Sequence, residues 1–95
     1  SCVKNSINIA VKIVLSEGYI ISDAINFITI ALNSYFSTLD FEKTTYISYA
    51  KIGNIILKSE GVDDYTDLEL NGAKENITLQ TNEIASMGTL EVSEE

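Results

Sequence analysis

The sequence predicts an α+β fold, a small two-layer sandwich with one mostly antiparallel sheet and two helices packed on one of its faces. Two patterns predict it. Apolar residues alternate with polar ones near the start and in the second half, while the middle carries two apolar stripes with helical spacing. The resulting order is β-α-α-β-β-β, and a sheet with both helices on one face buries every stripe. A chain of 95 residues suffices for one domain, residues 1–95, and is too short for two.

The first strand is predicted over residues 6–16. Its alternating apolar positions are Ile7, Ile9, Val11, Ile13 and Leu15, as in a strand with one buried face. Gly18 then permits a turn. Ser22 followed by Asp23 predicts a helix N-cap with a negative charge in the first turn.

The first helix follows from an apolar stripe with spacings of three and four. The stripe consists of Ile25, Ile28, Leu32, Tyr35 and Leu39. Phe27, Ile30 and Phe36 widen the apolar surface beyond that stripe, so this helix needs cover on two sides. The second cover comes either from the next helix or from a neighbouring chain, which makes these three residues candidate protein contacts.

A second helix is predicted over residues 46–59, with the Thr44-Thr45 pair as its cap. Gly53 in its interior predicts close packing against the first helix, because a glycine there costs about 1 kcal/mol relative to alanine. Gly61 supplies the left-handed residue at which helices often end.

A strand is predicted over residues 62–70, where apolar and acidic positions alternate. Asp63, Asp67 and Glu69 fall on its wet face, which is strongly acidic. They are the second set of candidate protein contacts, although an ordinary solvated face explains the same pattern.

A hairpin is predicted next, because both residues of Asn71-Gly72 accept positive φ. Ile77 and Leu79 supply the returning strand, either after a strict two-residue turn or after a longer loop. Leu90 and Val92 predict a last short strand, and the acidic residues after it are expected to fray.

Charge excludes several classes of partner. Six basic and fourteen acidic residues give a net charge of −8, so the long-range field repels phosphate backbones and no nucleic acid partner is expected. No apolar run is long enough to cross a bilayer, since Lys12 and Glu17 interrupt the first run and Asp23 precedes the second. We therefore expect no membrane partner.

The residue types for common chemistry are missing or scattered. Histidine is absent, so the ordinary catalytic triads are excluded and no enzyme activity is expected. Cys2 is the single cysteine and is interpreted as a thiol without a role. The glycines are dispersed and no calcium-loop spacing occurs, so the sequence predicts no catalytic residues, no metal site, no cofactor and no small-molecule substrate.

Several motifs then occur in a fixed order. They are Tyr46-Ile47-Ser48-Tyr49-Ala50-Lys51-Ile52, Glu60-Gly61-Val62-Asp63-Asp64-Tyr65-Thr66-Asp67-Leu68, Leu70-Asn71-Gly72, Asn76-Ile77 and Glu83-Ile84-Ala85-x-x-Gly88. Together they resemble the C-terminal region of the baseplate J-like proteins, which are wedge components of contractile-tailed phages and phage-like particles. Ser86-Met87 departs from the larger aliphatic residues that are common before the glycine.

The resemblance implies a structural assembly module without catalytic function. Proteins of this kind assemble with other baseplate wedge or hub proteins into a ring around the tail hub, and self-association is a further possibility. The expected location is the baseplate of a virion or phage-like particle, after synthesis in the bacterial cytoplasm. Since the chain begins at Ser1 without an initiator Met or a secretory signal, we expect the C-terminal domain of a larger protein.

Two alternatives belong to other functional classes. A ferredoxin-like small-molecule-sensing regulatory domain also combines one sheet with two helices, but it normally separates its helices by strands. Here only the link from Leu39 to Thr45 stands between the predicted helices. An adhesion or secretion-system module would differ mainly in its neighbours.

Overall fold

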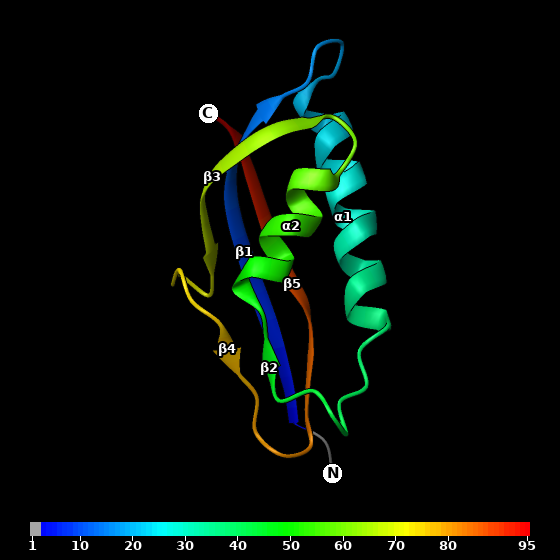
Figure 1. Cartoon of the computed structure of the whole chain (residues 1–95), viewed down its shortest axis with the longest axis vertical. Helices are drawn as coiled ribbons and strands as arrows, with labels where there is room; N and C mark the ends of the chain where they lie inside the picture. Colours follow the sequence, from blue (N-terminus) through cyan, green and yellow to red (C-terminus); the bar gives the residue numbers. More distant parts are fainter. Residues whose placement is uncertain (1–2) are drawn as a thin grey trace.

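The structure is a computed structural model that describes residues 3–95, so Cys2 lies outside the described residues. The elements are β1 (Val3–Leu15), α1 (Ile21–Ser37), β2 (Tyr46–Ile47), α2 (Tyr49–Lys58), β3 (Val62–Leu70), β4 (Ile77–Thr78) and β5 (Glu83–Glu94). The main sheet has the strand order β3-β1-β5, and both helices cover one of its faces (Figure 1). The predicted α+β fold is confirmed.

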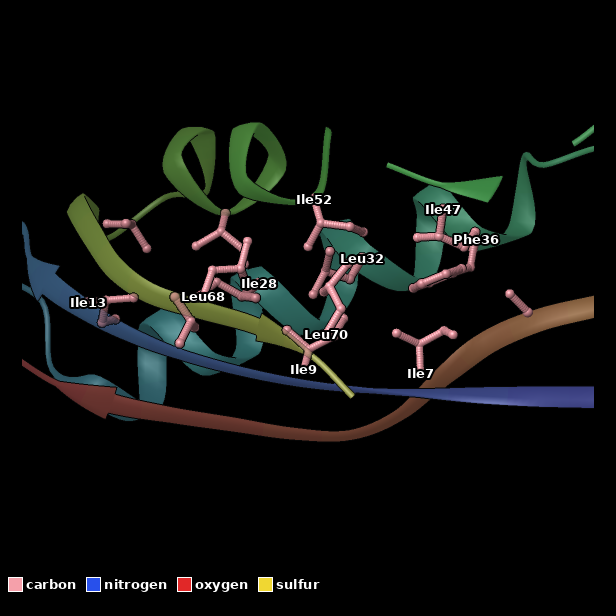
Figure 2. Close-up of a cluster of buried hydrophobic side chains, with 14 of the residues drawn as sticks. Ile7, Ile9, Ile13, Ile28, Leu32, Phe36, Ile47, Ile52, Leu68 and Leu70 are labelled. Atoms are coloured by element: carbon pink, nitrogen blue, oxygen red, sulfur yellow. The ribbon is translucent and has the colours of Figure 1, made fainter. Parts of the chain in front are cut away.

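The core lies between the sheet and the two helices, as Figure 2 shows. Its largest fully buried side chains are Ile7, Ile9, Ile13, Ile28, Leu32, Ile47, Ile52, Ile56, Leu68 and Leu70. Each buried aliphatic side chain of this size stabilises the fold by roughly 1.5–3 kcal/mol before entropy is counted. The alternating residues of the predicted first strand thus do face the core.

The main sheet is mixed. β1 pairs antiparallel with β3 and parallel with β5. The sequence predicted a mostly antiparallel sheet and only a short last strand, so the long parallel pairing is the feature it missed. The acidic end, which was expected to fray, is paired in the structure: β5 continues to Glu94, and the amide of Glu95 donates to the carbonyl of Ile13 at 2.8 Å.

The strands run along the long axis of a molecule that measures 46 × 22 × 18 Å. Because β1 and β5 are parallel, β1 begins at one end of the long axis and β5 finishes at the other (Figure 1). The two layers therefore expose two long surfaces, one formed by the helices and one by the open face of the sheet.

Helix α1 begins two residues earlier than predicted. Its N-cap is Ile20, and the carboxylate of Asp23 accepts a hydrogen bond from the Ile20 amide at 3.3 Å. Ser22 lies inside the helix, so its assignment as the N-cap was wrong. The reason is that Asp23 reaches back to the chain entering the helix, which is the acidic half of a capping box.

Helix α2 is shorter than the predicted 46–59. Its N-cap is Ser48, whose Oγ accepts from the Lys51 amide at 3.2 Å, and Oδ1 of Asn76 accepts from the Tyr49 amide at 2.8 Å. The predicted Thr44-Thr45 cap was wrong, because Tyr46–Ile47 forms a strand before the helix begins.

Gly53 packs against β3 rather than against α1. A Cβ at this position would overlap the hydroxyl of Tyr65 and lie 3.6 Å from Leu68. The prediction of close packing was right, and the predicted neighbour was wrong. Gly61 has φ of +89°, in agreement with the predicted left-handed end of the helix.

The Asn71-Gly72 turn forms as predicted, with φ of 52° and 81°. Leu70 and Ala73 exchange two backbone hydrogen bonds of 2.8 and 3.1 Å, so the turn has two residues. The returning strand differs from both predicted registers, because Ile77 pairs with Ile47 of β2 instead of with β3. There Ile77 packs at the edge of the core, close to the buried Ile47.

Candidate protein-contact surfaces

The helix surface contains two of the three predicted contact residues. Ile30 is 68% exposed and Phe27 is 36% exposed. They are one helical turn apart on α1, so both contribute to one apolar area at the surface. The structure thus makes these two side chains accessible to a partner.

Phe36 is a core residue, which corrects its assignment as a contact. Its side chain is 6% exposed and lies beside Leu32 and Ile47 in the core (Figure 2). Its ring also meets the Tyr35 ring edge-on at 5.5 Å between centroids. The physical reason is the phase of the helix: the buried positions of α1 are Ala24, Ile28, Leu32 and Phe36, in steps of four.

The three predicted acidic contacts of β3 do not form one cluster. Two irregularities in the pairing of β1 with β3 interrupt the strand, one near each of Asp63 and Asp67. Such irregularities bend a strand and re-aim its side chains. Asp63 and Asp67 are exposed and Glu69 is half-buried, so the alternating wet face predicted for residues 62–70 is broken into separate parts.

Asp67 lies in the left-handed region with φ of 51° and is held by two lysines. Its Oδ1 accepts from Nζ of Lys74 at 3.0 Å, and its Oδ2 lies 3.6 Å from Nζ of Lys12. The hydrogen bond from Lys74, together with the two positive charges, lowers the pKa of the Asp67 carboxyl. One of the predicted acidic contacts is therefore already paired with lysines of the same domain, in half-exposed ion pairs of modest strength.

A second acidic residue, Glu91, lies near Glu69 on the open face of the sheet, which the sequence did not reveal. Ala10 of β1 is opposite Glu69 on one side and Glu91 on the other. With strands about 4.8 Å apart, the two acidic residues stand roughly 10 Å apart across the small Ala10. They flank a depression of about 280 Å³ lined by Asn8, Ile9, Ala10, Glu69, Gly72, Thr89 and Glu91.

Asn8 fixes this open sheet face. Its amide donates to Oδ1 of Asn71 at 2.7 Å, and its own Oδ1 accepts from the Thr89 amide at 2.9 Å. One residue of the central strand thereby joins the turn after β3 to the irregularity in β5 beside Gly88. The acidic depression is consequently built on backbone that is hydrogen-bonded on both sides.

Across residues 3–95, no group of three or more His, Cys, Asp or Glu side chains is arranged to hold a metal ion. No helix in this part is long and apolar enough to span a membrane.

Comparison with known proteins gives a consistent result. Residues 7–93 match the family described as the baseplate J-like protein C-terminal domain. The chain is 26% identical over its full length to the phage-like element PBSX protein XkdT of Bacillus subtilis (strain 168), of which it covers 27%. It is also 35% identical over 60 residues, 63% of the chain, to the uncharacterized protein YqbT of the same organism, of which the match covers 17%.

The chain thus spans about a quarter or less of the length of these two relatives. The family match runs from Ile7 within β1 to Ser93 within β5 and takes in both helices, so it includes both surfaces described above. With this match over most of its length, the chain belongs to the baseplate J-like protein family, as a C-terminal domain of that family.

Proposed function

We propose that this domain is a structural assembly module of a contractile-tail baseplate in a phage or a prophage-like particle, and that it acts through contacts with other baseplate proteins. The match of residues 7–93 to the baseplate J-like C-terminal domain carries the proposal. The resemblance to a protein of the phage-like element PBSX supports it. A non-enzymatic role is consistent with that family.

Two surfaces are the proposed contacts. The first is the apolar area of α1 at Phe27 and Ile30. The second is the acidic open sheet face, where Glu69 and Glu91 lie on either side of Ala10. Asp63 and Asp67, at the two irregularities of β3, are proposed as separate acidic contacts. Apolar side chains in a partner interface stabilise by removing area from water, while acidic groups at the rim guide association and set its register.

A complementation experiment tests this role. In the bacterium that encodes the full-length protein, the gene is deleted, particle production is induced, and tails with complete baseplates are counted by electron microscopy. We expect the deletion to abolish complete baseplates and the wild-type gene to restore them. Normal particles without the protein would contradict the proposal.

The same strain separates the two surfaces. Ile30→Lys places a charge in the apolar area of α1, and Glu69→Lys reverses a charge beside the open depression. Each is expected to lower the number of complete baseplates about tenfold, because a reversed or inserted charge at a contact opposes association. Glu75→Lys is the matched control, because Glu75 is exposed in the link after the Asn-Gly turn, outside both surfaces.

A further inference from the structure

A groove between the two helices is lined by residues that the proposed contacts do not use. It has a volume of about 480 Å³ and takes Ala31, Ser34, Tyr35 and Thr38 from α1 and Asn54, Ile55, Lys58 and Ser59 from α2. A hollow of about 190 Å³ lies beyond Tyr35, bounded by Leu39, Lys43, Thr44, Thr45, Tyr46, Ser48 and Lys51. Tyr35 lines both hollows, and we call the two together the inter-helix groove.

The floor and the rim of the inter-helix groove differ in polarity. Tyr35 and Ile55 are half-buried apolar side chains on its floor, whereas Asn54 and Lys58 are exposed at its rim. Lys51 and Lys58 are seven residues apart on α2, which places them on one side of the helix about 10 Å apart. The groove therefore offers an apolar strip with a positive charge near each end.

The charge of the groove is opposite to that of the domain. Lys43, Lys51 and Lys58 are half of the six basic residues, and no carboxylate of residues 3–95 lines either hollow. Helix α1 carries its single charge at Asp23 in its first turn, well before the groove begins at Ala31. In a chain of net charge −8, this is a locally positive region whose lining also includes the apolar residues Ile55 and Leu39.

We infer that the inter-helix groove binds an acidic amphipathic segment of another baseplate protein. Apolar side chains of that segment would pack over Tyr35 and Ile55. Carboxylates about 10 Å apart would meet Lys58 at one end and Lys51 at the other, and Lys43 adds a further positive charge in the second hollow. Burying lysines beside an apolar floor without an opposite charge is costly, so the chemistry of the groove selects carboxylates. The inference rests on the proposed function.

Two other occupants are less favoured. The densest acidic stretches within residues 3–95 lie on the paired strands β3 and β5, and a strand held in a sheet cannot enter a groove between helices, which disfavours a second copy of the chain. Nucleic acid also carries negative charge, but a long polyanion is repelled by the domain as a whole, which has fourteen acidic and only six basic residues. A short acidic segment interacts mainly with the lysines next to it, because salt screening limits the range of electrostatic interactions at the surface to about 8–10 Å.

Site-specific cross-linking in the assembled particle tests the inference. In the full-length protein, Asn54 at the rim of the groove is replaced by the photoreactive residue p-benzoylphenylalanine, and Ser86 on the open sheet face is replaced in a second variant. Particles are irradiated and the linked peptides are identified by mass spectrometry. At Asn54 we expect a peptide from another baseplate protein that carries both apolar and acidic residues. A link to nucleic acid, a link to a second copy, or no link would overturn the inference.

Charge reversal provides a second test of the inference. Lys58→Glu is expected to lower the yield of the Asn54 cross-link about tenfold or more, and Lys4→Glu is the matched control, because Lys4 is an exposed lysine on β1 outside the groove. Reversing a carboxylate of the identified segment to lysine should restore the yield with Lys58→Glu, and failure to restore it would contradict a direct pair. Links at Ser86 without links at Asn54 would contradict only the inference about the inter-helix groove. Absence of the protein from the particles would contradict the proposed function as well.

Discussion

Asn8 and Asn71 are joined by two hydrogen bonds. The amide of Asn8 donates to Oδ1 of Asn71 at 2.7 Å, and the amide of Asn71 donates to the carbonyl of Asn8 at 2.8 Å. Asn71 adopts φ of 52°, a left-handed conformation that asparagine tolerates better than most residues. One side chain thus shapes the turn after β3 and also ties that turn to the central strand.

Substitutions at Asn71 should separate these two contributions. Asn71→Gly keeps the conformation but loses the hydrogen bond, so it should lower the free energy of unfolding by about 1 kcal/mol. Asn71→Ala also adds the left-handed strain and should cost about 2–3 kcal/mol. Asn71→Asp keeps an acceptor and should change least. Urea denaturation measures all three, and equal losses for Gly and Ala would show that the conformation contributes nothing.

Gly53→Ala tests the packing of α2 on β3. Alanine raises helix propensity by about 1 kcal/mol, but its Cβ meets Tyr65, and overpacking typically costs 1–3 kcal/mol. We expect a net destabilisation of about 1 kcal/mol by thermal or urea unfolding. In a Tyr65→Phe background the loss should shrink, because the overlapping hydroxyl is gone. A Gly53→Ala variant more stable than wild type would refute the close approach.

The ion pairs of Asp67 predict a pH dependence of stability. Because the pKa of Asp67 is lowered in the folded state, its pairing stabilises the fold above the usual value of 3.8 and is lost as the pH falls through the lowered pKa. The pKa of Lys74 is raised above 10.5 by the same contact, so that contribution is lost only as the pH rises through the raised value. The stabilising window therefore covers the neutral range.

Asp67→Asn isolates this effect, since asparagine also tolerates the left-handed conformation. The difference in melting temperature between wild type and variant should be present near neutral pH and should vanish in acid below the lowered pKa. Glu75→Gln, at an exposed carboxylate that does not take part in the ion pairs of Asp67, serves as the control for a general charge effect. A difference that persists unchanged in strong acid would contradict the assignment to the Asp67 carboxylate.

Phe36 and Ile30 should respond in opposite ways to truncation. Phe36→Ala empties a core position and should cost about 3–5 kcal/mol, whereas Ile30→Ala removes an exposed side chain and should stay within about 0.5 kcal/mol. Denaturant unfolding of the domain checks both. Comparable losses for the two variants would mean that the phase of α1 is wrong.

Local patterns accounted for most of the elements. The alternation of β1 is uninterrupted from Ile7 to Ile13, and the Asn71-Gly72 dipeptide has few backbone options, so both were predictable. The phase of α1 was harder, because its buried stripe starts at Ala24, whose small side chain gives little apolar signal. The sequence pattern therefore placed Phe36 at the surface, although it continues the buried stripe of Ile28 and Leu32.

Pairing between distant segments was beyond the sequence patterns. The alternation of β5 is broken at Gly88, where the register against β1 shifts, so the strand resembled several short pieces. Its partner lies about 80 residues earlier in the chain, and nothing local encodes a parallel pairing. The position of Glu91 opposite Ala10 depends on that pairing. The hydrogen bond of the C-terminal Glu95 to β1 depends on it too. Strands β2 and β4, with two residues each, are too short to show a period.

The central claim is that this domain works by contact with its neighbours in a baseplate. Cryo-electron microscopy of the assembled particle tests it most directly, because it shows what lies against each surface. The account predicts that the domain occupies the baseplate with Phe27 and Ile30 of α1, or the open sheet face around Glu69, covered by another protein. A particle in which both surfaces face solvent, or one that lacks the protein, would contradict it.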